Sequence, residues 1–227
     1  MLFSAEHNCS ALVNKLKAFL LLACLAAGTF TALNTEAATS SNSTVRFSLS
    51  YGTVHFGNID VELFDQDRPI TVSNFLDYAQ SGAYDNSIIH RCDPDFIIQG
   101  GQYSVANPYS TNKVDFLSSI PEGAPIPGEY NVGPQHSNSF GTLAMALTDL
   151  GAGPDVDSAT ASWFFNIDDN STILTNYTVF GRVKAGSKYL NFFRTLSEDN
   201  GIINMFGTNY YTEIGRASCR ERVLASV

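Results

Sequence analysis

Two short apolar runs around a polar turn constrain this chain most. The stretch Ile88–Gly101 reads Ile-Ile-His-Arg-Cys-Asp-Pro-Asp-Phe-Ile-Ile-Gln-Gly-Gly. Its middle, Cys92–Asp95, has turn chemistry, because proline presets φ and aspartate bonds back to its own backbone. The sequence therefore predicts a strand, a tight connection and a second strand. Arg91 then stands beside Phe96 and Gln99 on rigid elements. A cation, an aromatic ring and an amide close together indicate a recognition surface, and no Ser-His-Asp set or metal-ligand spacing accompanies them.

The other segments alternate in the way of short strands, with helices only near the two ends. Residues 45–50 alternate apolar and polar side chains, as a half-buried strand does. Pro69 opens a helix that Gly82 ends. The long stretch 103–138 is rich in Gly, Pro, Ser and Asn, so surface loops are predicted there. Further strands are predicted at 57–64, 141–147, 161–167 and 177–183, and a second helix at 187–196. This order indicates a closed barrel capped by two helices.

Several motifs in register resemble one family. His-Arg, four residues, Phe, two residues and Gln-Gly-Gly, at residues 90–101, resemble the signature of the cyclophilins, the barrel-shaped peptidyl-prolyl cis-trans isomerases. Matching motifs follow the same order at Val61–Phe64, Pro69–Leu76, Gly141–Ala146, Ser158–Asn166 and Val179–Gly181. The similarity covers residues 45–196. It implies a mainly β fold, a closed eight-stranded antiparallel barrel capped by two helices. The family's barrel ends in one more strand, and we expect that final strand to be missing here.

The resemblance also assigns site residues. Arg91 matches the catalytic arginine, and Gln99 matches the glutamine that positions it and contacts the substrate backbone. The resemblance implies substrate binding by Phe96, Ile97, Ala146, Leu147, Ser162, Phe164, Ile173, Leu174 and Tyr177. Either Leu174 or Ile173 completes the wall of the proline pocket, depending on whether the loop before Tyr177 carries a deletion.

Some positions depart from the family pattern. Leu147 stands where Asn or Arg is common, so only its backbone can meet the substrate. Ser162 replaces a glutamine and reaches less far. Ile173 or Thr172 stands where an aromatic residue favours cyclosporin, so weak cyclosporin affinity is expected.

The resemblance implies an isomerase acting on X-Pro bonds of folding or exported proteins. Such a catalyst needs no nucleophile, metal or cofactor, because it has only to hold a twisted amide better than a planar one. The alternative is a non-catalytic, cyclophilin-like module that binds proline-containing peptides or acts as a chaperone. Ser162, Leu147 and the expected lack of the last strand favour that alternative, whereas four residues favour the enzyme: Arg91, Phe96, Gln99 and Phe164.

The first 38 residues have the layout of a secretory signal peptide. Lys15 and Lys17 precede an apolar run, and small residues follow as far as Ala38. The run is shorter than the ~20 residues of a membrane anchor, so we expect export, to the periplasm, without stable membrane insertion. A lipoprotein anchored through Cys24 is the alternative, because Leu21–Cys24 resembles a lipoprotein box.

The charge composition limits the kinds of partner that we expect this chain to bind. Residues 39–212 hold 8 Lys and Arg against 18 Asp and Glu, a net charge of −10. This acidity argues against nucleic-acid binding, which needs a basic patch. We expect a monomer whose partners are proline-containing polypeptides. Cys92 is the one cysteine of the predicted domain, so no internal disulfide is expected there, and it is interpreted as a packing residue.

The last residues look foreign. Residues 213–223 resemble the translation of a DNA-sequencing adapter and carry three arginines, Arg216, Arg220 and Arg222, in a chain otherwise poor in arginine. We therefore predict a signal peptide over 1–38, a linker over 39–44, a cyclophilin-like domain over 45–212 and a non-native tail over 213–227.

Overall fold

The first hairpin shows how alternating side chains build the sheet. The structure is a computed structural model that describes residues 41–51, 54–105, 117–195, 203–204 and 217–224. Strands β1 (Thr44–Tyr51) and β2 (Val54–Leu63) pair antiparallel. Val45, Phe47 and Leu49 are buried, whereas the residues between them are half exposed. Side chains alternate between the two faces of a strand, so one face of this hairpin enters the core.

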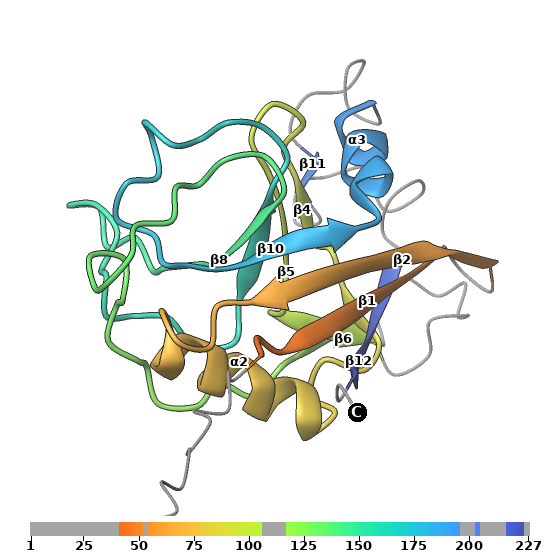
Figure 1. Cartoon of the computed structure of the whole chain (residues 1–227). Helices are drawn as coiled ribbons and strands as arrows, with labels where there is room; N and C mark the ends of the chain where they lie inside the picture. The colour runs from red at the N-terminus through yellow and green to blue at the C-terminus, as the bar shows by residue number, and fades with distance from the viewer. Residues whose placement is uncertain (1–40, 52–53, 106–116, 196–202, 205–216, 225–227) are drawn as a thin grey trace, which may run out of the picture. The chain divides into compact units, whose positions relative to one another are not determined.

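The strands form a curled antiparallel sheet with two helices (Figure 1). Helix α2 (Pro69–Gln80) lies near one end of the sheet and α3 (Ser187–Thr195) near the other. The strand order is β11-β4-β5-β9-β8-β10-β2-β1-β12-β3-β6-β7. After the first hairpin, the strands are β3 (Ser87–Ile88), β4 (Arg91–Cys92), β5 (Ile97–Gly100), β6 (Tyr103–Val105), β7 (Leu117–Ser119), β8 (Thr142–Met145), β9 (Trp163–Asn166), β10 (Val179–Ala185), β11 (Ile203–Asn204) and β12 (Ala217–Leu224).

Each face of the sheet carries its own apolar cluster. The larger one, the inner core, includes Phe47, Phe75, Trp163, Phe165 and Phe180. The smaller one, here called the outer cluster, consists of the buried residues Phe64, Ile97, Ala144, Phe164, Leu174 and Val179, with Phe96, Ala146 and Tyr177 packed against it. Neighbours in one strand alternate between the clusters, because successive side chains point to opposite faces.

Two glycines make room for the largest side chain of the inner core. A Cβ on Gly100 or Gly101 would lie 2.7 Å from the ring of Trp163, closer than packed atoms approach. Gly101 also has a φ of +77°, which glycine adopts without steric cost. The Gly-Gly pair after Gln99 therefore lets the indole pack against the backbone.

Helix α2 is fixed at its start by a loop that is distant in sequence. Arg68, just before the helix, is fully buried and donates to the carbonyls of Val132 (2.6 Å) and Pro134 (2.7 Å). Buried Glu129 accepts from the backbone N–H groups of Ile70 (3.2 Å) and Thr71 (2.8 Å). This carboxylate satisfies N–H groups that a helix leaves without partners in its first turn. The clamp also positions the segment that leads to Asn138.

Two expectations about the chain's course were wrong. The stretch 103–138 is not loop throughout, because β6 and β7 pair with each other and Ile126 bridges to Ala159. The final strand is not missing, because β12 pairs with β1 from Thr44↔Leu224 to Tyr51↔Ala217. An alternating sequence such as 45–50 leaves the second edge of β1 open to another strand, and backbone pairing depends little on which side chains the partner carries.

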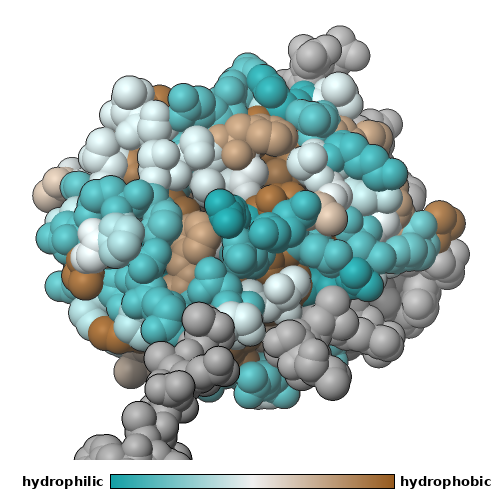
Figure 2. All heavy atoms as spheres, viewed as in Figure 1, coloured by the Kyte–Doolittle hydropathy of each residue, from teal (hydrophilic) through white to brown (hydrophobic). Residues whose placement is uncertain are grey.

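The described residues all belong to one compact unit, Ser41–Val227. Hydrophilic residues cover most of the face shown in Figure 2, and hydrophobic surface occurs in small areas between them. Within the described ranges, no helix has the length and apolarity needed to cross a membrane.

Candidate functional site

A row of side chains crosses four strands on the outer face of the sheet. Directly opposed pairs in the ladders are Arg91↔Gln99, Gln99↔Phe164 and Phe164↔Ala144. Opposed residues of paired strands share a face and lie within contact range of one another. The structure thus places the predicted arginine, glutamine and phenylalanine side by side on β4, β5 and β9.

Two groups surround the guanidinium of Arg91. Its Nη2 lies 3.5 Å from Oδ2 of Asp93, two residues further along the chain. Its Cζ lies 5.6 Å from the ring centre of Phe96, within the range of a cation–π contact. Arg91 keeps about a third of its side chain exposed (31%). A fixed but accessible cation can donate hydrogen bonds to a ligand that lies over the outer cluster.

The outer cluster brings six of the predicted substrate-binding residues together. They are Phe96, Ile97, Ala146, Phe164, Leu174 and Tyr177. The two neighbouring candidates for the wall differ in burial: Leu174 is 7% exposed and belongs to the cluster, whereas Ile173 is 68% exposed and does not.

Two of the three departures from the family pattern, Leu147 and Ser162, lie beside the cluster. The N–H of Ala146 donates to the carbonyl of Ser162 (2.9 Å), so these segments are joined through the backbone. Ser162 is half exposed, and the side chain of Leu147 packs against the inner core. Neither side chain is part of the outer cluster.

Tyr177 closes one side of the cluster. Its ring meets that of Phe164 edge to face, with centres 5.7 Å apart. Burial raises the pKa of Tyr177 above its ordinary value, the charge of Asp149 raises it further and Arg91 opposes both. The phenol therefore stays neutral at physiological pH, and carboxylate and guanidinium charges act on the same small region.

The neighbours of Arg91 in the sequence are structural. His90 is 6% exposed, and its ring meets that of Tyr103 edge to face at 5.3 Å. Burial, and then the charge of Arg91, lower the pKa of His90 to about 4. Burial, and then the charge of Asp93, raise the pKa of Cys92 to about 12. An imidazole and a thiol that both stay neutral at pH 7 pack in the core, so neither offers acid–base or nucleophilic chemistry.

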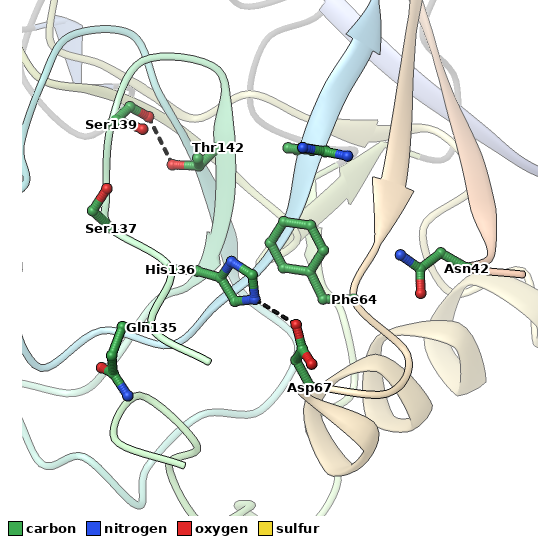
Figure 3. Close-up of a pocket in the computed structure, with 9 residues that line it drawn as sticks. Asn42, Phe64, Asp67, Gln135, His136, Ser137, Ser139 and Thr142 are labelled. Carbon is green, nitrogen blue, oxygen red and sulfur yellow. Dashed lines mark hydrogen bonds and ion pairs between the residues drawn. The ribbon is translucent and has the colours of Figure 1, made fainter. Parts of the chain in front are cut away.

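A separate polar pocket of about 380 Å³ lies nearby and contains none of the predicted site residues. His136 Nε2 lies 2.7 Å from Oδ2 of Asp67, and the ring of His136 stacks on that of Phe64 with centres 4.0 Å apart (Figure 3). Phe64 also belongs to the outer cluster, so the two features share one wall. The pocket is lined by Asn42, Phe64, Asp67, Gln135, His136, Ser137, Ser139, Thr142 and Arg182.

Sequence reasoning missed several residues of this region. Phe64, Ala144 and Val179 lie in the outer cluster. All three sit in the motifs that carry the resemblance, and strand alternation could have assigned Ala144 the face of Phe164. The pairing of Asp93 with Arg91 could also have been suspected, because the two opposite charges are only two residues apart in the sequence. No group of three or more His, Cys, Asp or Glu that could hold a metal occurs among the residues described.

Comparisons with known proteins agree with this geometry. The sequence model of the family described as cyclophilin type peptidyl-prolyl cis-trans isomerase/CLD matches residues 44–207. A peptidyl-prolyl cis-trans isomerase of Acinetobacter baylyi is 36% identical over 137 residues, 58% of this chain and 64% of that protein. Peptidyl-prolyl cis-trans isomerase A of Dickeya dadantii is 32% identical over 153 residues, 65% of this chain and 72% of that protein.

Solved structures show the same fold. A cyclophilin type peptidyl-prolyl cis-trans isomerase of Cryptosporidium parvum has a TM-score of 0.58 at 23% identity and covers 82% of this chain and 99% of its own. The same protein solved in the presence of the dipeptide Ala-Pro has a TM-score of 0.57 at 24% identity and covers 81% of this chain and 99% of its own. With the family model matching more than half of its length, this chain belongs to the cyclophilin-type peptidyl-prolyl cis-trans isomerase family.

Proposed function

We propose that this chain catalyses cis–trans rotation about X-Pro bonds, with Arg91 as the catalytic residue. The observation that carries the proposal is the row Arg91–Gln99–Phe164 beside the outer cluster. This row sets a guanidinium at the edge of a small apolar site. A prolyl amide has the complementary arrangement, a polar peptide bond next to an apolar ring.

The reaction needs no bond to be made or broken. A peptide bond resists rotation because the nitrogen lone pair is shared with the carbonyl. Before proline the two isomers are close in energy, yet they exchange in tens to hundreds of seconds. A site accelerates rotation if it binds the twisted amide more tightly than the planar one. A guanidinium that donates to the prolyl nitrogen does so, because a twisted amide leaves that lone pair free to accept.

Each neighbour supports the guanidinium in a different way. Phe96, Ile97, Phe164 and Leu174 hold the proline ring, and their apolar surface excludes water, which strengthens the hydrogen bond. Gln99, opposite Arg91 in the ladder, positions the guanidinium and contacts the substrate backbone. Ala146 and Tyr177 pack against the outer cluster, and Leu147 and Ser162 border it through their backbone. Exposed Ile173 precedes Leu174, which is buried in the cluster.

The natural substrates follow from this site. Proline-containing segments of unfolded or exported polypeptides fit it, and the Cryptosporidium parvum relative was solved in the presence of Ala-Pro. Residues 1–38, with Lys15 and Lys17 before an apolar run, would direct a secreted, periplasmic bacterial enzyme, or one anchored through Cys24. The acidic composition suits a monomer that binds no nucleic acid.

The curled sheet also supports a closed eight-stranded barrel. Two residues separate β3 from β4, and two separate β5 from β6, although each pair is far apart in the strand order. In the interval between β3 and β4, the N–H of His90 donates to the carbonyl of Gln99 in β5 (3.0 Å). Counting β3–β4 and β5–β6 as one strand each, the barrel would consist of these two together with β1, β2, β8, β9, β10 and β12.

Exchange NMR on a peptide containing Ala-Pro separates a catalyst from a binding module. We expect catalytic amounts of the full chain to raise the cis–trans exchange rate well above that of the free peptide. Shifted peptide resonances without faster exchange would favour the binding module. If the chain causes no shift of the peptide resonances and no faster exchange, both functions are contradicted.

A further inference from the structure

A chain of buried asparagine side chains connects two walls of the proposed proline pocket. Asn138, Asn166 and Asn170 are 3%, 0% and 2% exposed. Nδ2 of Asn170 donates to Oδ1 of Asn166 (2.8 Å), and Nδ2 of Asn166 donates to Oδ1 of Asn138 (2.9 Å). Three amides separated by up to 32 positions in sequence thus form one continuous line of hydrogen bonds.

Both ends of this line bind the backbone of pocket residues. Nδ2 of Asn170 also donates to the carbonyl of Phe96 (2.8 Å), in the turn before β5. Nδ2 of Asn138 donates to the carbonyls of Leu174 (2.7 Å) and Tyr177 (3.3 Å), in the loop before β10. Phe96, Leu174 and Tyr177 pack in or against the outer cluster. The line therefore spans from one wall of the pocket to the other.

The sheet anchors the line at its middle. Asn166 lies in β9, opposite Ile97 and two residues after Phe164, so its side chain is on the face that bears the outer cluster. Its Nδ2 also donates to Oγ1 of Thr142 (2.9 Å), and that hydroxyl donates to the carbonyl of Ser139 (2.7 Å; Figure 3). The hydrogen bonds thereby fix both loops to rigid strands and not only to each other.

We propose that Asn138, Asn166 and Asn170 are positioning residues that set the width of the proline pocket by fixing the Phe96 turn and the 174–177 loop to β9. The proposal rests on the proposed function of that pocket. Buried polar networks are rigid when every member is satisfied, and the loss of one partner leaves the others unpaired in a dry site. A displaced wall weakens the grip on the proline ring in the planar and twisted states alike, which raises KM rather than lowering kcat.

Asn166→Asp tests this with almost no change of volume. The new oxygen faces the two oxygens that Nδ2 now satisfies, so the line is broken at its middle. We expect KM, and the Kd of an Ala-Pro peptide measured by NMR titration, to rise roughly tenfold while kcat stays within about twofold. Asn74→Asp is the matched control, because Nδ2 of Asn74 donates to the carbonyl of Thr160 (2.7 Å) away from the pocket.

Asn138→Ala and Asn170→Ala, singly and together, give a second test if Asn166→Asp does not fold. Each should raise KM and Kd, and the double variant should show less than the combined effect, because both act through Asn166. A folded Asn166→Asp or alanine variant with unchanged KM and Kd would overturn the proposal, as would an equal rise in Asn74→Asp. If the wild type binds the peptide without turnover, weaker binding in the variants still supports the positioning role while the proposed catalysis fails. A wild type that neither binds nor turns over the peptide contradicts both.

Discussion

The guanidinium of Arg91 lies 3.5 Å from the carboxylate of Asp93, two residues ahead on the same side of the chain. The pair is only partly exposed, at 31% and 17%. Asp93 comes from the turn that separates the two apolar runs of the signature. The carboxylate therefore does more than form the turn: it places a negative charge at the proposed catalytic cation.

Asp93→Asn should change the preference for charged substrates. Asp95 and Asp149 are exposed, and the charge of Asp149 acts on Tyr177. Together with Asp93, these carboxylates should disfavour acidic residues next to proline. We expect the ratio of kcat/KM for Lys-flanked over Glu-flanked prolyl peptides to fall about two- to fivefold in the variant at low salt. The difference should shrink at 0.5 M salt, where screening weakens exposed charges. An unchanged ratio at low salt would show that Asp93 does not act on the substrate.

Stability should fall between pH 6.5 and pH 4 because of His90. Its pKa is lowered to about 4, mainly by burial and then by Arg91, against about 6.5 in an unfolded chain. Well above pH 6.5 His90 is neutral in both the native and the unfolded state, so it does not destabilise the fold there. As the pH falls to 4, the unfolded state takes up a proton and the native state does not, which destabilises the fold by on the order of 3 kcal/mol.

Urea unfolding of the wild type and of His90→Phe at several pH values measures this contribution. The variant should lose clearly less stability over that window. The hydrogen bond from Arg46 lowers the pKa of Asp60 below its ordinary value of 3.8, so the stability that this carboxylate contributes is retained through most of the window and is lost only at more acidic pH. Parallel pH profiles for the two proteins would contradict the burial of a neutral His90.

Cys92 should resist alkylation in the native protein. Burial, together with Asp93, raises its pKa to about 12 from 9.0, and its Sγ lies 3.6 Å from the carbonyl of Phe193. At pH 8 the reactive thiolate is then roughly a thousandfold rarer than in an unfolded chain. Mass spectrometry of the Cys92 peptide after iodoacetamide treatment, with and without urea, measures the difference. Equal labelling in both conditions would be incompatible with this packing.

Glu129→Ala should destabilise the fold by about 2–4 kcal/mol. The change leaves the N–H groups of Ile70 and Thr71 without their acceptor and removes one of the two carboxylates, with that of Asp67, whose charges favour the buried Arg68 cation. Glu129→Gln, which keeps one acceptor, should lose less. Exposed Glu122→Ala is the control for charge, and urea midpoints compare all four proteins. A wild-type midpoint for Glu129→Ala would show that the cap is dispensable.

The strands and the core could be predicted wherever the pattern of apolar and polar residues is compatible with only one arrangement. Val45, Phe47 and Leu49 were assigned to one face, and all three are buried. Phe75 on the predicted helix is also in the core, as the 3.6-residue spacing requires. Both cases depend on periodic burial, which a sequence displays directly.

The remainder depends on contacts that a sequence does not display. Whether Leu174 or Ile173 enters the cluster is a one-residue question of loop length, and only the folded loop decides it. The three asparagines stand in or beside segments rich in polar residues, where an asparagine normally indicates a turn. β12 pairs through its backbone, so its side chains gave no signal of a strand.

The isomerisation rate of Arg91→Ala tests the account most directly. Losing a donor to the transition state in a dry site costs roughly 10²–10³ in rate, and Arg91→Lys should restore little because it lacks the planar fork. Arg182→Ala is the matched control, because this arginine is an exposed residue of the same sheet and pairs with Glu62 at 2.8 Å. Exchange NMR on an Ala-Pro peptide gives kcat, and circular dichroism confirms folding. We predict a loss of at least a hundredfold in kcat for Arg91→Ala and nearly none for Arg182→Ala; a folded Arg91→Ala with wild-type kcat would contradict the assignment of the site.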